Sequence, residues 1–555
     1  MSSIKHLSWK ISLLLVGLLF WGLNPYTEPI DFTQDQRYTL APATLNLLES
    51  VEQPLQIDVF LSGPIPQDYQ RLRRETQLFL SRLQKRSNWI EVNFINPFEE
   101  VEDPKAVVQM MGRYGLAPEN VFEQDATGMI QQFVFPWAII NTGEKSVRVK
   151  ITEQQLGQSP AEKIQRAIEN LEYLFMDGID QLLGDKNKSI GVLRSHGCSS
   201  NLKLYDFLST LGKYYNIAPI DLRKAKSAYD ELREVLSQID LLLISNPVEE
   251  FEPLEQFVLD QHLINGGHAL WLVDPIRINR DSLFNQRGKA LAYKQDLNLD
   301  ELLFKYGLRL SSNLVQDLFS APIVLAQGAN NASQYIPFPW PYYPLPSPEQ
   351  NKIFGISSGP VWLRFPGTLD TLKNSLHKTI LLRTSKSSRS LPTPMVVQLK
   401  EVETKIDPTA YSETELPLGV LLEGIFDSAF KNRILPEPAQ SVVESGTSKL
   451  IFISDGSLAE NQIDKGSPLP LGFDKWTRNS YENLSFLTQI THFLMGKNDR
   501  LSMKNKTYKV SYLDPNKVAR QGWNWKITVI FGPLIWFGAI YMSIQFWRKR
   551  QINRT

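Results

Sequence analysis

The residues best suited to nucleophilic chemistry lie at Leu193-Arg194-Ser195-His196-Gly197, directly after a predicted strand. A nucleophilic serine on a sharp strand-to-helix turn has the pattern Gly-x-Ser-x-Gly, because the strained turn tolerates no side chain at the glycine positions. Leu193 occupies the first of these positions, and the sequence places no third triad member. The pattern therefore favours a loop at the carboxyl end of a strand, where open α/β sheets bind ligands, over a catalytic Ser195.

The same loop carries Cys198, the only cysteine of the chain. His196 could activate its thiol, but neighbours on one loop rarely reach the geometry of a catalytic pair. A single cysteine forms no intrachain disulfide and no multi-cysteine zinc site. We therefore interpret Cys198 as an ordinary thiol.

Other polar residues near strand ends give no metal site. His262 and His268 straddle two glycines and cannot share a helix face. Asp274 and Asp455 end apolar strands, where a carboxylate often caps the following turn. The sequence Asp455-Gly456-Ser457 is too sparse for a calcium loop. We expect neither of these pairs to hold a metal ion.

Nucleotide hydrolysis is also not indicated. The phosphate-binding pattern Gly-x-x-x-x-Gly-Lys-Ser/Thr is absent from the sequence, and Thr142-Gly143-Glu144-Lys145-Ser146 only looks similar, in a predicted hairpin turn. We therefore predict no catalytic residues, no cofactor-binding residues and no metal ligands, and expect that the chain is not an enzyme.

The composition is that of a large and mostly soluble protein. The 555 residues include 59 basic and 59 acidic side chains, so the cationic surplus that nucleic-acid binding requires is missing. Hydrophobic residues make up 42% and charged residues 21%, which argues against disorder. A mean hydropathy of -0.23 excludes a many-span membrane protein but leaves room for a few anchors.

Two apolar segments near the ends of the chain predict such anchors. Residues 8–26 reach about 28 Å as a helix, and the small-x-small pattern of a signal-peptide cleavage site does not follow, so we favour an uncleaved anchor over a cleaved signal peptide. Residues 527–547 contain no charged side chain, and Arg548-Lys549-Arg550 follow at once. The positive-inside rule then predicts an inner-membrane protein with two spans, both termini in the cytoplasm and a large periplasmic domain.

The elements after the first anchor predict a thioredoxin-like domain over residues 31–185. Thr39 is placed to cap a short helix, strands are expected at 55–61, 91–95, 133–141 and 146–151, and helices at 67–85, 105–114 and 161–176. The predicted helix at 67–85 carries apolar or small residues at helical spacing: Tyr69, Leu72, Thr76, Phe79, Leu80 and Leu83. Redox chemistry requires Cys-x-x-Cys after the first strand, and Ser62-Gly63-Pro64-Ile65-Pro66 stands there instead.

Alternating strands and helices predict a doubly wound, flavodoxin-like parallel sheet over residues 186–515. Strands are expected at 189–193, 217–222, 239–245 and 269–273, with helices at 202–214 and 254–263. Later strands at 418–422 and 449–454 and a helix at 480–495 are expected to rejoin this sheet. Pro219 predicts a short or edge strand at 217–222.

An insertion of about 311–415 interrupts this domain. It contains the proline-rich stretch Ile336-Pro337-Phe338-Pro339-Trp340-Pro341-Tyr342-Tyr343-Pro344. Because proline lacks an amide hydrogen, we predict neither helix nor sheet there, but an extended loop with exposed aromatic side chains. The predicted organisation is thus an anchor at 1–30, two domains at 31–185 and 186–515, and a C-terminal helix with a basic tail at 516–555.

Several stretches of the sequence resemble the GldG family, the gliding-motility-associated ABC transporter component often described as substrate-binding. They span nearly the whole chain and are Arg37-Tyr38-Thr39-Leu40, Val59-Phe60-Leu61-Ser62-Gly63, Phe94-Ile95-Asn96-Pro97, residues 265–275 (Asn-Gly-Gly-His-Ala-Leu-Trp-Leu-Val-Asp-Pro), residues 296–307, Pro339-Trp340-Pro341-Tyr342-Tyr343-Pro344-Leu345 and Leu471-Gly472-Phe473. The chain departs from the family pattern at Ser195-His196-Gly197-Cys198, where an acidic residue is expected after the glycine, and at Ser457, where the family tends to carry an aspartate. Both departures discourage the transfer of a ligand site.

The resemblance implies an accessory subunit without enzymatic activity. Its partners would be a separate multi-span ABC permease subunit and a cytoplasmic ATPase subunit in the inner membrane, serving gliding motility or associated secretion in Bacteroidota-like bacteria. Two alternatives stay open. A membrane-anchored solute-binding protein would hold its ligand near residues 194–198 and 246–250, and a periplasmic hydrolase would use Ser195 or Cys198.

Overall fold

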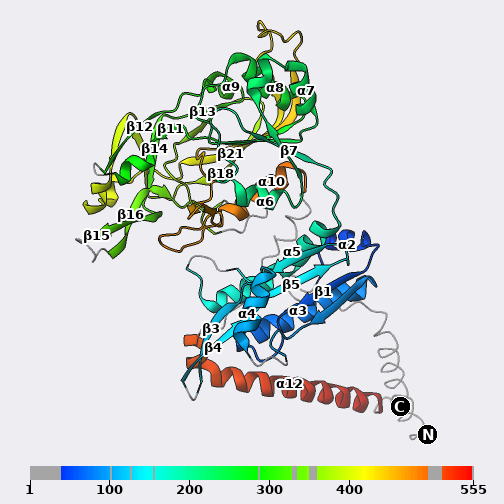
Figure 1. Ribbon diagram of the computed structural model, residues 1–555. Coiled ribbons are helices and arrows are strands. Elements are labelled where there is room, and N and C mark those ends of the chain that lie inside the picture. The colour runs from blue at the N-terminus through cyan, green and yellow to red at the C-terminus, as the bar shows by residue number, and fades with distance from the viewer. Residues whose placement is uncertain are drawn as a thin grey trace. The chain divides into compact units, whose positions relative to one another are not determined.

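The computed structural model describes residues 39–99, 103–125, 128–153, 157–285, 288–327, 334–348, 359–497 and 515–552. The C-terminal helix belongs to a compact unit of its own, distinct from the unit that holds the rest of the described chain, so each unit is described by itself (Figure 1). The predicted N-terminal anchor at residues 8–26 lies outside the described residues. The predicted domain boundaries stay predictions.

The N-terminal part is a small mixed sheet with helices. Its elements are α2 (Pro42–Glu49), β1 (Leu55–Val59), α3 (Gln67–Arg86), β2 (Ile90–Phe94), α4 (Pro104–Arg113), β3 (Glu119–Asp125), β4 (Gly128–Val134), β5 (Trp137–Asn141), β6 (Ser146–Lys150) and α5 (Pro160–Leu183). The sheet order is β2-β1-β5-β6, with β1 and β2 parallel and the other pairs antiparallel. The thioredoxin-like assignment stays a prediction, but the predicted helices and most strands are present.

Successive side chains of β5 point to opposite faces of this sheet, and helices pack on both faces. Ala138 and Ile140 of β5 join the core that α3 and α5 cover, whereas Trp137 and Ile139 pack on the opposite side with the α4 residues Val107 and Met111. The residues of α3 that are buried are the six predicted from helical spacing. A 3.6-residue apolar stripe therefore identified the packed face of α3 correctly.

Two predictions in this part are wrong. The N-cap of α2 is Ala41, without a side-chain hydrogen bond, so Thr39 caps no helix. Phe133 belongs to β4, which pairs with β3 in a hairpin that the sequence analysis missed. Polar residues face apolar ones across this hairpin, as in the pairs Phe122–Gln131 and Glu123–Ile130, so the apolar alternation that marks a half-buried strand is weak there.

The central part is built on a seven-stranded sheet of order β18-β21-β22-β10-β9-β7-β8. Its strands are β7 (Ser189–Leu193), β8 (Asn216–Ile220), β9 (Leu241–Ser245), β10 (His268–Leu272), β18 (His377–Arg383), β21 (Pro417–Asp427) and β22 (Ser445–Ile453). Its helices are α6 (Tyr205–Leu211), η1 (Leu222–Lys226), α7 (Tyr229–Ser237), α8 (Pro253–Ile264), η2 (Arg280–Phe284), α9 (Asp300–Lys305) and α10 (Asn483–Leu494). As Pro219 predicted, β8 is an edge strand.

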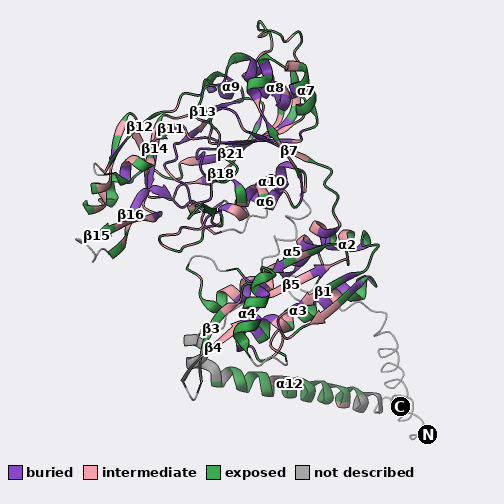
Figure 2. Cartoon of the chain, viewed as in Figure 1, coloured by how far each residue is buried: buried purple, intermediate pink, exposed green. Residues whose placement is uncertain are grey.

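Both faces of the sheet are covered, as the near-continuous apolar strands predict. Every residue of β9 is buried. Leu242 and Ile244 pack in the core shared with α7, α8 and α9, while Leu241 and Leu243 pack in the core shared with α6 and α10. Figure 2 shows the buried residues concentrated in these strands.

The sheet is mixed, not parallel throughout as predicted. Strands β8, β7, β9, β10 and β22 run parallel, but β21 pairs antiparallel with β22 and β18 antiparallel with β21. No helix lies between Asp427 and Ser445 to carry the chain back across the sheet, so the two consecutive strands meet antiparallel. Strand β18 comes from the predicted insertion, which is therefore part of the sheet.

The other elements between β10 and β21 form small antiparallel sheets and two short 3-10 helices. They are β11 (Ile276–Ile278), β12 (Lys289–Lys294), β13 (Leu308–Leu310), β14 (Asn313–Asp317), β15 (Ser320–Gln327), β16 (Gln334–Pro344), β17 (Leu369–Thr371), β19 (Ser388–Pro392), β20 (Met395–Gln398), η4 (Leu399–Glu403) and η5 (Pro408–Ala410). Two short strands, β23 (Ile463–Asp464) and β24 (Ser467–Pro468), follow β22.

The proline-rich stretch is a strand, and the prediction of an exposed loop is wrong. Strand β16 pairs with β15 over seven residue pairs, and Trp340 and Tyr342 are each 1% exposed. The prolines alternate with the other residues of β16. Among the described strands β16 pairs only with β15, so its other edge does not need the amide hydrogens that proline lacks. Backbone carbonyls of β16 still accept hydrogen bonds from outside the sheet, as Tyr342 O does from Phe365 N at 2.9 Å.

The C-terminal unit contains the helix α12 (Pro515–Ile552). Its segment Trp525–Trp547 has 23 residues, a mean hydropathy of 1.9 and no buried residue, and Figure 2 shows it exposed along its described length. At about 1.5 Å per residue it exceeds the roughly 30 Å of a hydrocarbon core. The predicted C-terminal span is thus present as a helix long and apolar enough to cross a membrane.

Candidate functional site

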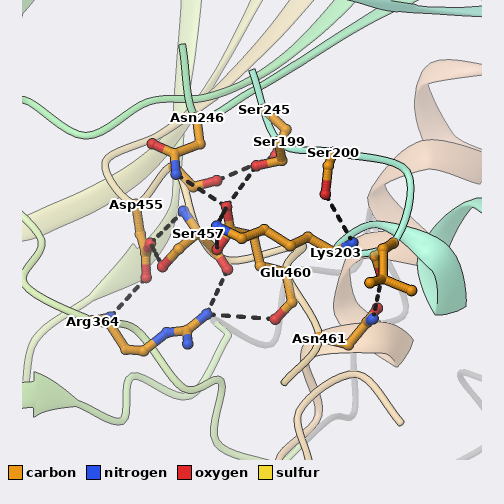
Figure 3. A network of polar contacts seen from close by, with 12 residues as sticks. Ser199, Ser200, Lys203, Ser245, Asn246, Arg364, Asp455, Ser457, Glu460 and Asn461 are labelled. Carbon is orange, nitrogen blue, oxygen red and sulfur yellow. Dashed lines mark hydrogen bonds and ion pairs between the residues drawn. The ribbon is translucent and has the colours of Figure 1, made fainter. Parts of the chain in front are cut away.

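The polar loops of the central part meet at the carboxyl edge of its sheet, as expected for parallel strands. The loops after β7, β9 and β22 bring together Ser199, Asn246 and Glu460 (Figure 3). The strand order reverses between β7 and β9, so this is the switch point at which doubly wound sheets bind ligands. It is also where the sequence analysis placed a crevice, at residues 194–198 and 246–250.

The chain itself fills this crevice. His196 O accepts from Val248 N at 2.8 Å, and Ser245 O accepts from Ser199 N at 3.0 Å, so the two loops are joined directly. A Cβ on Gly197 would lie 2.4 Å from Val248, so only glycine fits, and its φ of +64° favours glycine too. These contacts hold the two loops tightly against each other.

Glu460 enters the switch point from the loop after β22. Its carboxylate accepts from Ser199 Oγ at 2.7 Å and from Asn246 Nδ2 at 3.0 Å, and pairs with Lys203 Nζ at 3.4 Å (Figure 3). Burial alone would raise the pKa of Glu460, but Arg364 and Lys203 together with these hydrogen bonds lower it. The carboxylate is therefore ionised, and it lies at the switch point.

A second group of buried charges lies beside Glu460. Arg364 donates its backbone N to Asp455 Oδ2 at 2.7 Å and its Nη2 to Ser457 O at 2.8 Å. Asp455 Oδ1 accepts from Ser457 N at 2.8 Å, which confirms the predicted turn cap. Asp274 instead accepts from Gly456 N at 2.6 Å, so it caps the turn after β22 and not its own turn. These contacts fasten the insertion to the sheet.

The electrostatics of this group set Asp274 apart. Burial, and the nearby carboxylate of Asp455, raise the pKa of Asp274 to about 7, although Arg280 opposes the shift. A carboxyl group in these surroundings is partly protonated near neutral pH. The group can therefore exchange a proton, and Asp274 is only partly exposed to solvent.

Ser195 and His196, which lie in the incomplete Gly-x-Ser-x-Gly pattern, contact each other. Glu255, which the sequence analysis did not place, contacts His196 as a third residue. His196 Nδ1 lies 2.8 Å from Ser195 Oγ, and Nε2 lies 3.0 Å from Glu255 Oε2. His196 is 1% exposed and stacks on Phe251, with ring centroids 4.1 Å apart. Ser195 Oγ also accepts from Leu222 N at 3.2 Å.

This serine–histidine–glutamate row has the contacts of a catalytic triad but is buried and internally satisfied. Glu255 Oε2 accepts from Glu252 N as part of the capping box of α8, so the row joins the β7 loop, η1 and α8. The capping-box spacing after Pro253 was the signal in the sequence that could have found Glu255. The arrangement fits a structural role better than nucleophilic attack, which needs an oxygen accessible to substrate.

Cys198 is not activated by His196, because both ring nitrogens of His196 face Ser195 and Glu255. Burial raises the pKa of the Cys198 thiol to about 12, and Ser245 and Arg194 only partly oppose this. The thiol is thus protonated at neutral pH, as the interpretation of an ordinary thiol requires.

His262 and His268 contact each other. His262 Nε2 lies 3.2 Å from the backbone oxygen of His268, and burial lowers the pKa of both imidazoles, that of His268 to about 4. Within the part of the chain that the structure describes, no group of three potential metal ligands is present. The look-alike phosphate-loop sequence lies, as predicted, in a turn, where Thr142 N donates to Lys145 O.

Sequence reasoning missed the residues that close the crevice. Glu460 and Arg364 lie far from the loops that they contact, and neither belongs to a recognisable motif. Only the proximity of Glu460 to the end of an apolar strand hinted at a position on this edge.

Two family models match parts of the chain. Residues 187–490 match the family model described as an ABC-type uncharacterized transport system, whose name marks an auxiliary protein, and residues 34–141 match a domain of unknown function. An uncharacterized protein of Borreliella burgdorferi is 20% identical over 99% of this chain and 98% of its own length. The solved mmIFT52 N-terminal domain aligns with 59% of this chain and all of its own at 14% identity, with a TM-score of 0.33.

Proposed function

The chain belongs to the family of auxiliary proteins of ABC-type transport systems, and from this premise we propose that it is a membrane-anchored, non-enzymatic subunit that works with a separate permease and a separate cytoplasmic ATPase. The observation that carries the proposal is the helix Trp525–Trp547, apolar and unburied in the structure. An exposed apolar surface of this size requires a membrane or a partner. The chain itself has no phosphate-binding loop, so the energy must come from a neighbour.

The proposed topology has two spans, with both termini in the cytoplasm and residues between the spans in the periplasm. The basic run Arg548-Lys549-Arg550 after the helix supports a cytoplasmic C-terminus. In this topology the anchors can transmit a conformational change of the permease to the periplasmic body. By resemblance to the GldG family, we assign the system to gliding motility or associated secretion in Bacteroidota-like bacteria.

Contacts at the end of α10 support transmission from the C-terminal anchor. Lys188 Nζ, in the linker between the two sheets, donates to Met495 O at 2.6 Å. Lys497, at the last described position before the C-terminal unit, pairs with Asp180 of α5 at 3.6 Å. The segment that leads to the anchor therefore starts where the linker and the end of α5 meet, and a pull on it would act on both sheets.

Co-purification tests this assembly. We expect the tagged full-length chain, extracted from its host membrane with mild detergent, to retain a multi-span permease and an ATPase. As a matched control, residues 527–547 are replaced by an unrelated apolar helix of equal length, which should keep the chain in the membrane but lose the partners. Recovery of the native chain alone, while other transporters stay intact, would refute the assembly.

Labelling tests the topology. A cysteine introduced by Thr555→Cys should react with a membrane-impermeant maleimide only after the inner membrane is opened. The native Cys198 gives little background because its thiol pKa is raised to about 12. Labelling of this tail in intact spheroplasts would show that the C-terminus lies outside and that the proposed topology is wrong.

The two alternative functions are supported less well. A solute-binding protein needs an open crevice, whereas Glu460 fills the one at the switch point. Ser195 has the contacts with His196 and Glu255 that a hydrolase would require. If the protein were such a hydrolase, Ser195→Ala would abolish its function. Retained function in the Ser195→Ala, Cys198→Ser double variant would eliminate the hydrolase.

A further inference from the structure

The insertion lines an open cavity that the proposed assembly does not use. Its volume is about 510 Å³, and its walls include Gln316 of β14, Trp340 and Tyr342 of β16, Arg389 of β19, and Glu401 and Tyr411. Cavities of about 300–1,000 Å³ with aromatic walls and a few polar groups are typical of small-molecule sites. This cavity lies apart from the switch point that Glu460 closes.

Arg389 is held in one orientation at the wall of the cavity. It lies directly opposite Gln316 in the pairing of β14 with β19, and its Nε donates to Gln316 Oε1 at 2.6 Å. Its guanidinium lies 4.5 Å from the ring centroid of Tyr411, whose hydroxyl donates to the same Oε1 at 3.2 Å. Gln316 is only 2% exposed, so the support of Arg389 is rigid.

The terminal nitrogens of Arg389 keep unused donor capacity. Among the described residues, its guanidinium contacts Gln316 through Nε and also the Tyr411 hydroxyl, and Lys405, exposed at the edge of the cavity, has no hydrogen-bond partner. Both carboxylates of the cavity already accept hydrogen bonds: Glu401 from the Tyr342 hydroxyl at 2.9 Å and from Gln398 N at 3.0 Å, and Asp407 from Thr409. The groups left without a partner are therefore cationic donors.

We propose that this cavity binds a small organic carboxylate, with the two terminal nitrogens of Arg389 donating to its two oxygens. A rigid guanidinium matches the geometry of a carboxylate in two parallel hydrogen bonds, which an ammonium group cannot do. Val402, Ile406 and the ring of Tyr411 supply apolar lining for the body of the ligand. Because the cavity holds two cationic and two anionic side chains, recognition depends on these short contacts more than on long-range attraction.

The test compares benzoate with benzamide, an uncharged molecule of nearly the same shape, on the full-length chain in detergent. For a ligand of this size we expect a Kd of roughly 1 mM for benzoate, measured by saturation-transfer NMR and calorimetry. Benzamide should bind at least about tenfold more weakly, because it offers one acceptor oxygen and no charge. Inorganic phosphate is the second anionic probe and should compete poorly, because it has no apolar body.

Arg389→Lys is the decisive variant, since it keeps the positive charge but removes the planar guanidinium that makes two parallel hydrogen bonds. It should weaken benzoate at least about tenfold, whereas Arg309→Lys, at an exposed arginine outside the cavity, should leave binding unchanged. Thermal unfolding and near-UV circular dichroism verify that each variant folds. Equal binding of benzoate and benzamide, tighter binding of phosphate, unchanged affinity in Arg389→Lys, or no benzoate binding up to about 10 mM would each overturn the proposal, and none of them bears on the co-purification result.

Discussion

The buried carboxyl of Asp274 predicts that the central part loses stability as the pH rises from 4 to 7. Burial and the neighbouring Asp455 raise its pKa from 3.8 to about 7. Between these values the folded chain holds a proton that the unfolded chain has released, so the free energy of unfolding falls with increasing pH. The contribution is fully present below the unfolded pKa and is lost as the pH passes through the folded one.

The shift sets an upper limit to the size of this effect. A change from 3.8 to about 7 corresponds to at most about 4 kcal/mol, at roughly 1.4 kcal/mol per pKa unit. For a domain of this size, each kcal/mol moves the melting temperature by about 2 °C. The wild type should therefore lose up to about 8 °C in Tm from this group alone.

Asp274→Asn isolates this term from all other titrating groups. The amide oxygen of asparagine can still accept from Gly456 N, which lies 2.6 Å from Asp274 Oδ1, but it has no proton to lose. Differential scanning fluorimetry of both full-length proteins from pH 4.5 to 8.5 gives the difference curve. We expect similar Tm values below pH 5 and a variant that is the more stable above pH 7.

Asp455→Asn is the contrasting control. Asp455 accepts from Arg364 N, Ser457 N and the Ser457 hydroxyl, so loss of one acceptor should lower stability by about 1–3 kcal/mol. Loss of its charge should also lower the pKa of Asp274 and so weaken the pH dependence, which Asp274→Asn removes altogether. Parallel curves for wild type and Asp274→Asn, or a variant that is the less stable above pH 7, would refute the reasoning about Asp274.

Three further changes have defined outcomes. Glu460→Gln should lower the free energy of unfolding by about 2–4 kcal/mol, because it leaves buried donors and Arg364 without the carboxylate. Lys203→Met, at a side chain that is 46% exposed, should lower it by less than about 1 kcal/mol. Chemical denaturation measures both variants, and equal effects would contradict the role of Glu460. Cys198 should resist a maleimide at pH 8 in the folded chain and react after denaturation, since its pKa is raised to about 12; fast labelling of the native protein would contradict this. Gly446→Ala should unfold the chain or lower its stability by more than about 3 kcal/mol, because the added Cβ would lie 1.7 Å from Ile264 O; a folded variant with unchanged Tm would contradict the packing described.

Local pattern predicted the elements well where one face or both faces are buried. The spacing of apolar residues in α3 identified all of its buried positions, and the apolar run of β9 identified a strand buried on both faces. These features depend on residues within one or two turns, or within a single strand. The hairpin β3–β4 escaped because its residues lack apolar alternation.

The sequence predicted the position of the candidate site but not the residues that fill it. The loops at 194–198 and 246–250 do meet at the sheet edge, because strand direction fixes where the carboxyl ends lie. What fills the site was not predictable, since Glu460 is separated from Ser199 by 261 positions. Likewise, Glu255 lies 59 positions from His196, beyond any spacing rule.

The sequence alone therefore determined the alternation of helices and strands, the apolar helix near the C-terminus, the single unactivated cysteine and the lack of a phosphate-binding loop, because each depends on composition or short-range periodicity. The tertiary structure decided that β21 runs antiparallel, that the prolines of β16 sit in a paired strand and that a carboxylate of the chain occupies the switch point. Those outcomes depend on which distant segments pack together, and packing energy is a property of the assembled fold and not of any one segment.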